Sequence, residues 1–399
     1  MDFSISAEQR NLQSRVIRFA QSELGTEAEF HDREGSFDLA GWRRCADFGV
    51  LGWPVPREYG GGGLDLFDTV LALEALGYGC HDNGLVFAVN NHLWACAVYL
   101  TRHGSDSLRA RFLPELVFGR MIGAHALTEA GAGSDIAAME TVAQRSGDHW
   151  VLNGVKSFVS NGPVADVFIV FARTSDAAAP QRALSAFVVT RDMPGVAVTD
   201  TFDKSGLRSC PMGEITFDEC RIPADHMLGV EGDGHHIFSA TAAWERGMMF
   251  ASQVGVLRRL VEAGMRQAKS RQQFGRPIGA FQSVAHDLAD ANLRLELARL
   301  LLYKVAWLHQ RDRTALLESA MLKLYVSETV RDTALSLMQL HGARGYLTAW
   351  GIEREVRDAL AGTIYAGTSQ MQREAIAQLL GLPSGLGARR EPTGQAVRA

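Results

Sequence analysis

The sequence lacks any uncharged apolar run long enough to cross a membrane, so we expect no membrane span. It also lacks an excess of basic residues, because 40 Lys and Arg stand against 45 Asp and Glu, a formal net charge of -5. We therefore expect no nucleic-acid partner and no binding to anionic lipid. The first ten residues, MDFSISAEQR, contain no basic segment followed by an apolar stretch, so secretion is not expected.

Cysteine is scarce and unpaired in the sequence. The five cysteines are Cys45, Cys80, Cys96, Cys210 and Cys220. No two of them form a close CxxC pair, and their number is odd, so we expect neither a disulfide framework nor a zinc or other metal site. Reduced thiols of this kind are typical of a cytoplasmic protein.

The chain has 399 residues, enough for two or three packed units, and its 47% hydrophobic and 21% charged residues are ordinary for a globular protein. Hydrophobic periodicity divides it into a helical zone (1–125), a zone of short strands (126–235) and a second helical zone (236–383). The tail, 384–399, is rich in Gly, Pro and Arg and is predicted to be flexible. We predict an α+β fold: an N-terminal helical domain, a small central antiparallel β domain and a C-terminal four-helix bundle.

Several elements are predicted locally. Ser6 and Gln9 have the spacing of a capping box at the start of the first helix. Apolar periodicity predicts helices over Asp68–Gly77, Ile237–Leu257, Ala291–His309 and Leu316–His341. Runs of β-branched and aromatic residues predict strands over Asp166–Arg173, Leu184–Arg191 and Glu214–Pro223.

Two stretches have the composition of a cofactor site. Ala126–Asp135, ALTEAGAGSD, is a Gly-rich segment whose backbone N–H groups and hydroxyls suit a phosphate or a polar ring edge, although a solvated turn would have the same composition. In Asn153–Gly162, NGVKSFVSNG, the Asn-Gly pair predicts a hairpin turn. Phe158 and Ser160 then share one strand face, where they could stack on and hydrogen-bond a planar cofactor, or form an ordinary edge strand.

Three further stretches are ambiguous when taken singly. Arg271–Ile278, RQQFGRPI, reads as a helix ended by Gly and Pro, and Gln339–Tyr346, QLHGARGY, as a helix C-terminus. Tyr365–Gln370 reads YAGTSQ. Together with PREYGGGGLD at Pro56–Asp65 and KSGLR at Lys204–Arg208, these stretches resemble, in order and spacing, the acyl-CoA dehydrogenase family over about residues 1–381.

The resemblance implies an FAD-dependent enzyme that oxidises an acyl-CoA or acyl-carrier-protein thioester and passes electrons to an acceptor such as an electron-transfer flavoprotein. It also implies a homotetramer or homodimer, in which Arg271 and Phe274 reach the FAD of a neighbouring subunit. Phe158 stands where the family usually has tryptophan, Ser160 where it has threonine, and Ala343 where it has glycine. The implied FAD contacts are Leu127, Thr128, Gly133, Ser134, Phe158, Ser160, Arg271, Phe274, Gln339, Gly342, Thr368 and Gln370.

The resemblance also shows that a catalytic group is missing from its usual place. The second position of YAGTSQ is normally the glutamate that removes the substrate α proton, and here it is Ala366, whose backbone N–H could still stabilise an enolate oxygen. Glu245, on the apolar helix Ile237–Leu257, matches the base position of isovaleryl-CoA and long-chain dehydrogenases. The alternative is that Glu245 forms a structural ion pair with another helix. Arg246 matches an arginine that supports the site.

The remaining expectations concern the substrate. The resemblance implies substrate contacts at His92, Trp94, Arg246 and Tyr365, with core packing the stronger interpretation for Trp94, and a structural role for Glu129. The run Trp244-Glu245-Arg246 also resembles dehydrogenases of carrier-bound acyl groups, such as prolyl-carrier-protein dehydrogenases. A flavin oxidase or monooxygenase, or a non-catalytic flavoprotein on the same fold, remains an alternative.

Overall fold

The computed structural model describes residues 4–175 and 183–383, so the tail predicted to be flexible lies outside the described residues. The first zone is helical as predicted, and Ser6 and Gln9 form the expected capping box. No helix in the described part of the chain is long and apolar enough to cross a membrane. The helices of this zone are α1 (Ala7–Glu23), α2 (Ala28–Glu34), α3 (Leu39–Phe48), α4 (Leu66–Gly79), α5 (Asn83–His92), α6 (Val98–His103) and α7 (Asp106–Val117), with a π-helical segment, Leu93–Ala97, joining α5 to α6.

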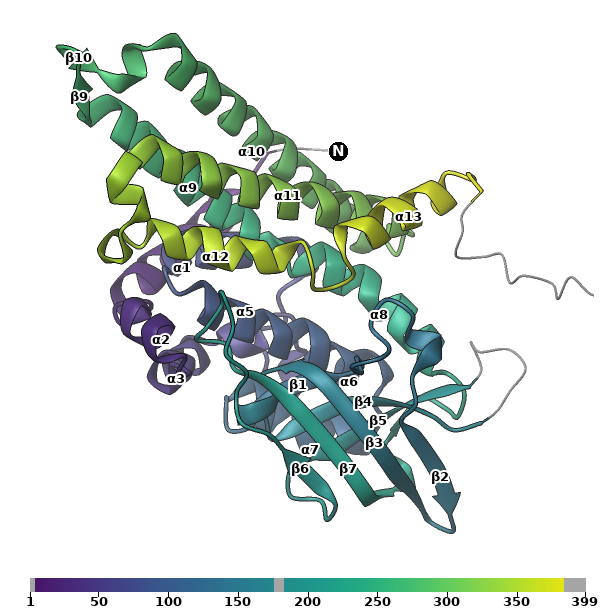
Figure 1. Ribbon diagram of the computed structural model, residues 1–399. Coiled ribbons are helices and arrows are strands. Elements are labelled where there is room, and N and C mark those ends of the chain that lie inside the picture. Colours follow the sequence, from purple (N-terminus) through teal and green to yellow (C-terminus); the bar gives the residue numbers. More distant parts are fainter. Residues whose placement is uncertain (1–3, 176–182, 384–399) are drawn as a thin grey trace, which may run out of the picture.

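The middle zone forms one sheet at the lower side of the molecule in Figure 1. Its order is β6-β7-β3-β2-β4-β5-β8, and β1 pairs with β4. The pairing is mainly antiparallel as predicted, but β1 and β2 both run parallel to β4. The strands are β1 (Gly123–Ala126), β2 (Val142–Ser146), β3 (His149–Ser160), β4 (Val167–Arg173), β5 (Leu184–Thr190), β6 (Val196–Val198), β7 (Met212–Pro223) and β8 (Met227–Leu228).

The predicted hairpin turn at Asn153-Gly154 is wrong. Both residues lie inside β3, where the pairing with β7 shifts register between Leu152 and Gly154. Gly154 has φ 147°, and an added Cβ would lie 2.5 Å from Thr141 Oγ1. The Asn-Gly pair therefore marks a bulge in a long strand, which allows two strands to approach closely.

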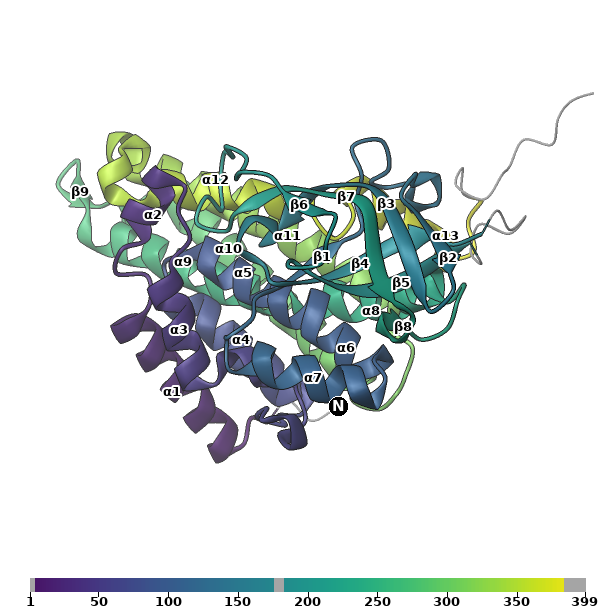
Figure 2. The ribbon, with the colours of Figure 1, turned by 90° about the horizontal axis from the view of Figure 1, so that it is seen from below.

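Strand β4 is covered on both faces of the sheet. Successive side chains of β4 alternate between the faces: Val167, Ile169 and Phe171 join a core with α6 and α7, whereas Phe168 and Val170 join the larger core beneath the N-terminal helices. Figure 2 shows α6 and α7 beside the sheet.

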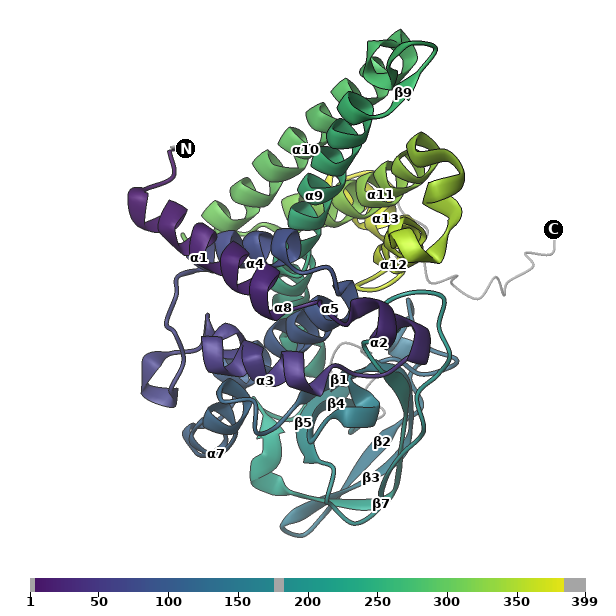
Figure 3. The ribbon, with the colours of Figure 1, turned by 90° about the vertical axis from the view of Figure 1, so that its left-hand side faces the viewer.

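The last zone is again helical. Gln339–Tyr346 ends a helix as predicted, but Arg271–Ile278 begins beyond a helix end and forms a two-stranded hairpin with Phe274 and Gly275 at its turn. The hairpin joins α9 (Ala251–Ser270) to α10 (Gln282–His309), and we call these two helices and the hairpin the arm. In Figure 3 the hairpin is the far tip of this arm, which points away from the sheet. The elements are α8 (Gly234–Met248), α9 (Ala251–Ser270), β9 (Gln272–Gln273), β10 (Arg276–Pro277), α10 (Gln282–His309), α11 (Leu316–His341), α12 (Ile352–Gly362) and α13 (Ser369–Leu379).

The single helix predicted over Ile237–Leu257 is wrong, because it is interrupted between α8 and α9 at Met249 and Phe250. The two helices have different packing partners. The start of α8 lies against β5, so that a Cβ at Gly234 would be 2.7 Å from Leu184, and α9 lies on α4, where a Cβ at Gly255 would be 1.9 Å from the carbonyl oxygen of Glu74. The interruption therefore lies between the segment that packs on β5 and the segment that packs on α4.

Candidate active site

Two adjoining cavities lie between the sheet and the C-terminal helices. The larger has a volume of about 640 Å³ and the smaller about 200 Å³. Both are lined by residues from the Gly-rich segment, by Phe158 and by Ala366. Lining the larger cavity are Thr128, Gly133, Ser134, Phe158, Ser160, Tyr365, Ala366 and Thr368 among the residues singled out from the sequence, and lining the smaller are Leu127, Thr128, Gly133, Ser134, Phe158, Glu245, Arg246 and Ala366.

A buried ion pair fixes the Gly-rich segment against β3. Lys156 is fully buried, and its Nζ donates to Glu129 Oε1 (2.8 Å) and to the Leu127 carbonyl (3.1 Å). The Ser157 N–H donates to the Thr128 carbonyl (2.8 Å). Burial lowers the pKa of Lys156 to about 8, against the opposing influence of Glu129.

Glu129 is turned into the protein, away from the cavities. Its carboxylate also accepts the N–H groups of Glu140 (2.6 Å) and Thr141 (2.9 Å). Because the carboxylate accepts hydrogen bonds from three donors, Lys156 Nζ and the N–H groups of Glu140 and Thr141, this side chain anchors the segment, in keeping with the structural role expected for it.

Phe158 and Ser160 both line the larger cavity, but simple strand alternation does not explain it. Phe158 has φ 58°, and the β3–β7 register shifts between Lys156 and Val159. The Phe158 side chain is 55% exposed, and the Ser160 carbonyl accepts a hydrogen bond from Asn91 Nδ2 (2.9 Å). A strained backbone at a cavity wall is typical of a functional site.

These residues fit a flavin. An exposed aromatic side chain can stack on a planar ring, and the hydroxyls of Thr128 and Ser160 can bond its polar edge. Gly133 and Ser134 of the Gly-rich segment line both cavities, and an added Cβ at Gly133 would have Thr128 Cγ2, at 3.9 Å, as its only neighbour within 4 Å, so the segment leaves room for a bound group. A volume of about 640 Å³ also falls in the range of cofactor sites.

Ala366 lies at the wall shared by the two cavities. It has φ 53°, a disfavoured conformation for a residue other than glycine. Gln372 Nε2 donates to the carbonyl oxygens of Ala366 and Gly367 (both 3.2 Å), which holds the backbone in this conformation. Within residues 4–175 and 183–383, no acceptor takes the Ala366 N–H. That N–H is a free donor beside the cavity.

Glu245, on α8, lines the smaller cavity together with Ala366. Its side chain is half-buried, and desolvation raises its pKa to about 7, although Arg246 opposes the rise. Its negative charge adds to the rise that burial causes in the pKa of Tyr99 and of Tyr365.

The alternative of a structural ion pair to another helix finds no partner. Among the described residues, no Lys, Arg or His lies within ion-pair distance of Glu245. Arg246 lines the same cavity and is half-buried, and burial lowers its pKa. A carboxylate that is desolvated, unpaired and at a cavity wall has the properties of a general base.

His92 and Trp94 lie in the core, where the chain passes from α5 into the π-helical segment. Neither is among the residues that line the two cavities. His92 Nδ1 accepts the Gly123 N–H (3.0 Å), its ring meets that of Trp42 edge-on at 5.0 Å, and burial lowers its pKa to about 3. The neutral imidazole thus anchors the start of β1, and a substrate contact for either residue stays a prediction.

Five predicted cofactor residues lie outside both cavities of this chain. Phe274, at the hairpin turn, is 91% exposed. All five are exposed: Arg271, Phe274, Gln339, Gly342 and Gln370. Thr368 does line the larger cavity, and its Oγ1 caps α13 by accepting the Met371 N–H (3.2 Å).

Local sequence reasoning missed part of the cavity wall. The loop Lys204–Leu207 lines the larger cavity, as do Phe87, Cys210 and Met212. The smaller cavity also includes His125, Phe238 and Ala242. For the loop, the KSGLR match was the only available signal, because these residues have no hydrophobic period.

Comparisons with known proteins agree with this geometry. Three models match in chain order: "Acyl-CoA dehydrogenase, N-terminal domain" over residues 6–120, "middle domain" over 124–220 and "C-terminal domain" over 232–381. The chain is 38% identical to the L-prolyl-[peptidyl-carrier protein] dehydrogenase of Pseudomonas fluorescens strain Pf-5, covering 96% of this chain and 100% of that protein.

Two solved structures have the same fold throughout. The crystal structure of the prolyl acyl carrier protein oxidase AnaB is 44% identical, with TM-score 0.93, covering 95% of this chain and 100% of that one. The structure of PigA with FAD and proline is 38% identical, with TM-score 0.93, covering 96% and 100%. The chain belongs to the acyl-CoA dehydrogenase family and is an FAD-dependent enzyme that dehydrogenates an acyl thioester.

Proposed function

We propose that Glu245 is the base that removes the α proton of the thioester. The observation that carries this proposal is the shared cavity: an unpaired carboxylate with a raised pKa faces the same space as Ala366, which has no side-chain base. FAD, when bound, supplies the acceptor for the β hydride. The Ala366 N–H is the donor available to the thioester oxygen as negative charge develops on it.

Burial gives Glu245 its basicity. A carboxylate in water has a pKa near 4.3 and is too weak a base for an α carbon, whereas the desolvated group at about 7 retains protons more strongly. Tyr365 borders the same site, and its hydroxyl is buried without a hydrogen-bond partner among the described residues. We assign Tyr365 and Arg246 to the substrate site.

We further propose that the acyl group is short and carried on a carrier protein, with a prolyl or similar aminoacyl group as first candidate. Both solved relatives described above have prolyl carrier protein or proline in their names, and the Pseudomonas protein is a prolyl-carrier-protein dehydrogenase. The smaller cavity, about 200 Å³, suits a short acyl group better than a long chain. An acyl-CoA substrate is the alternative.

Anaerobic titration of the FAD-loaded protein with matched thioesters tests both points. The panel contains prolyl and butyryl groups, each on a carrier protein and on CoA. We expect prolyl-carrier thioester to bleach the flavin absorbance fastest. Faster bleaching by both CoA thioesters refutes the carrier assignment, and no bleaching by any of the four refutes the dehydrogenase assignment and favours a non-catalytic flavoprotein.

We also propose a homo-oligomer, a tetramer or dimer, in which the arm reaches a neighbouring subunit. Leu293, Leu297 and Leu300 of α10 are 57%, 47% and 44% exposed and share one helix face, which forms an apolar stripe in the isolated chain. Phe274 at the tip of the arm is almost fully exposed. In the oligomer, Arg271 and Phe274 contact the FAD of a neighbouring subunit, and Gln339 and Gly342 are assigned to the phosphate-adenosine half of the cofactor. Light scattering of the purified protein gives the subunit number, and a monomer that binds FAD with full affinity refutes the arrangement.

A second candidate concerns the electron acceptor. We propose an electron-transfer flavoprotein as acceptor, but AnaB is named an oxidase, which favours molecular oxygen as the alternative. Mixing the substrate-reduced enzyme with air-saturated buffer separates them, because reoxidation within one turnover time indicates an oxidase. All five cysteines are buried and none forms a disulfide, which supports a cytoplasmic location.

A further inference from the structure

One wall of the larger cavity is a loop without helix or strand. Lys204, Ser205, Gly206 and Leu207, between β6 and β7, all line the cavity. Leu207 has φ 49°, which is disfavoured for a residue with a Cβ, so the backbone at this position needs an external restraint.

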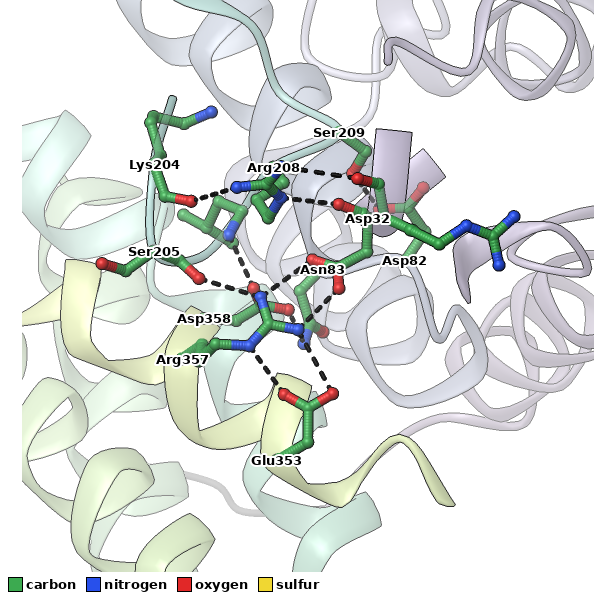
Figure 4. Close-up of polar contacts among 12 residues, drawn as sticks. Asp32, Asp82, Asn83, Lys204, Ser205, Arg208, Ser209, Glu353, Arg357 and Asp358 are labelled. Carbon is green, nitrogen blue, oxygen red and sulfur yellow. Dashed lines mark hydrogen bonds and ion pairs between the residues drawn. The ribbon is translucent and has the colours of Figure 1, made fainter. Parts of the chain in front are cut away.

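The restraint is a single buried carboxyl group on α12. Asp358 Oδ1 accepts the Leu207 N–H (2.6 Å), and its Oδ2 accepts Asn83 Nδ2 (3.0 Å). We call these three residues the Asp358 clamp. It joins α5 of the N-terminal helices, the loop of the β domain and α12 of the C-terminal helices, and Figure 4 shows the polar contacts around it.

Neighbouring contacts also hold the Lys204–Leu207 loop on α12. Arg357 Nη1 donates to the Ser205 carbonyl (2.8 Å) and to Asp32 Oδ1 (3.0 Å). At Gly206 the loop backbone lies directly on α12, because an added Cβ would be 2.3 Å from the Arg357 carbonyl oxygen. The loop therefore has no freedom to shift relative to α12 while these contacts persist.

The clamp connects two parts of the cavity wall. The loop forms one part, and the other is formed by Ala361 within α12 and by Tyr365 and Ala366 just after it. Asp358 is only 6% exposed, and burial followed by the charge of Glu355, with a contribution from Asp32, raises its pKa to about 7. Arg259 does not form an ion pair with Asp358, because its guanidinium pairs with Glu355 (2.9 Å). A carboxyl group retained at such a cost is a candidate for function.

We propose that Asp358 is a positioning residue for the flavin reaction, which ties the Lys204–Leu207 wall to α12 and so sets the width of the FAD cavity. This inference depends on the assignment of FAD to the larger cavity. It does not depend on the identity of the base or of the acyl carrier.

The test measures FAD affinity and the flavin absorption spectrum in variants that separate the loop from α12 by two routes. Asp358→Ala removes the clamp, and Gly206→Ala inserts a methyl group between loop and helix while Asp358 stays intact. We expect both to weaken FAD binding by about tenfold or more and to shift the flavin absorption bands, since each leaves buried groups unsatisfied or displaced. Asp358→Asn can still accept the Leu207 N–H but loses the bond to Asn83, so its effect should be intermediate.

The matched control is Glu74→Ala. Glu74 is equally buried and accepts hydrogen bonds from Tyr303 Oη (2.8 Å) and Arg299 Nε (2.9 Å), but it lines neither cavity. Its loss should lower the unfolding midpoint and leave the flavin spectrum unchanged. If Asp358→Ala behaves like this control, with unchanged FAD affinity and spectrum, the clamp is only structural and the proposal is overturned.

Two further comparisons keep the result decisive. If Asp358→Ala does not fold, Gly206→Ala and Asp358→Asn carry the test, and unchanged FAD affinity in both overturns the proposal. Phe158→Ala tests the cavity assignment separately. If Phe158→Ala shifts the flavin bands while the clamp variants do not, the clamp proposal fails; if none of the variants shifts them, FAD lies elsewhere.

Discussion

Replacing Glu245 by glutamine removes the proposed base while keeping the shape of the side chain. The expected loss follows from what proton removal contributes: a positioned general base accelerates a reaction by about 10²–10⁴-fold. The flavin should bind normally, because Glu245 lines the smaller cavity and is not among the residues that line the larger one, where FAD is assigned. Stopped-flow measurement of flavin bleaching by the best thioester gives the rate directly.

The pH dependence of the flavin bleaching rate provides a second quantitative test of the base. The base acts only when ionised, and the pKa of Glu245 is raised to about 7 by burial. The ionised fraction then rises about tenfold between pH 6 and pH 8, so the bleaching rate at limiting substrate should rise by the same factor in the wild-type protein. In Glu245→Gln the bleaching rate should no longer rise between pH 6 and pH 8.

The unfolding stability of Glu245→Gln shows whether a loss of activity comes from the missing base or from a damaged fold. Because the pKa of Glu245 is higher in the folded state than in the unfolded state, the folded state binds the extra proton, and its stability falls as pH rises from about 4.5 to about 7. At pH 8 the ionised carboxylate destabilises the fold, and glutamine removes that cost. Glu245→Gln should therefore unfold at the same or higher urea concentration than the wild type at pH 8.

A rescue variant completes this experiment. Since Ala366 lines the same small cavity, Ala366→Glu in the Glu245→Gln background returns a carboxylate to that cavity from a different element. Partial recovery of bleaching is expected. The assignment of the base would be refuted if Glu245→Gln bleaches within threefold of the wild-type rate. It would also be refuted if the rate in this variant still rises about tenfold between pH 6 and pH 8.

Three other outcomes are expected. Lys156→Met strands the buried Glu129 carboxylate, so the unfolding free energy should fall by about 3–5 kcal/mol, measured by urea denaturation, and FAD should bind more weakly. Gly154→Ala should destabilise by about 1 kcal/mol or more, because the methyl group meets Thr141; a neutral result would contradict the bulge. Phe274→Ala should change the unfolding free energy of the monomer by less than about 0.5 kcal/mol but lower FAD affinity in the assembled protein, measured by fluorescence titration, if the arm reaches a partner's cofactor.

The sequence predicted those elements whose signal is local. The capping box at Ser6, the strand predicted over Leu184–Arg191 and the helix predicted over Leu316–His341 depend on spacing and period within one segment. The structure contains all three, with the strand as Leu184–Thr190. The prediction failed where packing decided the structure. The Asn153-Gly154 pair has turn chemistry, but β7 extends past it and converts the turn into a bulge.

The candidate site was predictable in part for the same reason. The Gly-rich segment, Phe158 and Glu245 were identified because family motifs mark them, and they line the two adjoining cavities. The wall formed by Lys204–Leu207 was not identified as part of the site, because its position depends on Asp358, which lies 151 residues beyond Leu207. His92 was expected at the substrate pocket, yet its hydrogen bond to Gly123 is formed in the core, a contact that no local pattern encodes.

The interruption between α8 and α9 has a mechanical consequence. Glu245 belongs to the short helix that rests on β5, while the arm is carried by α9, a separate rod of 20 residues and about 30 Å. The carboxylate and the arm therefore have separate supports apart from α11, on which both helices pack: α8 also packs on β5, whereas α9 also packs on α4.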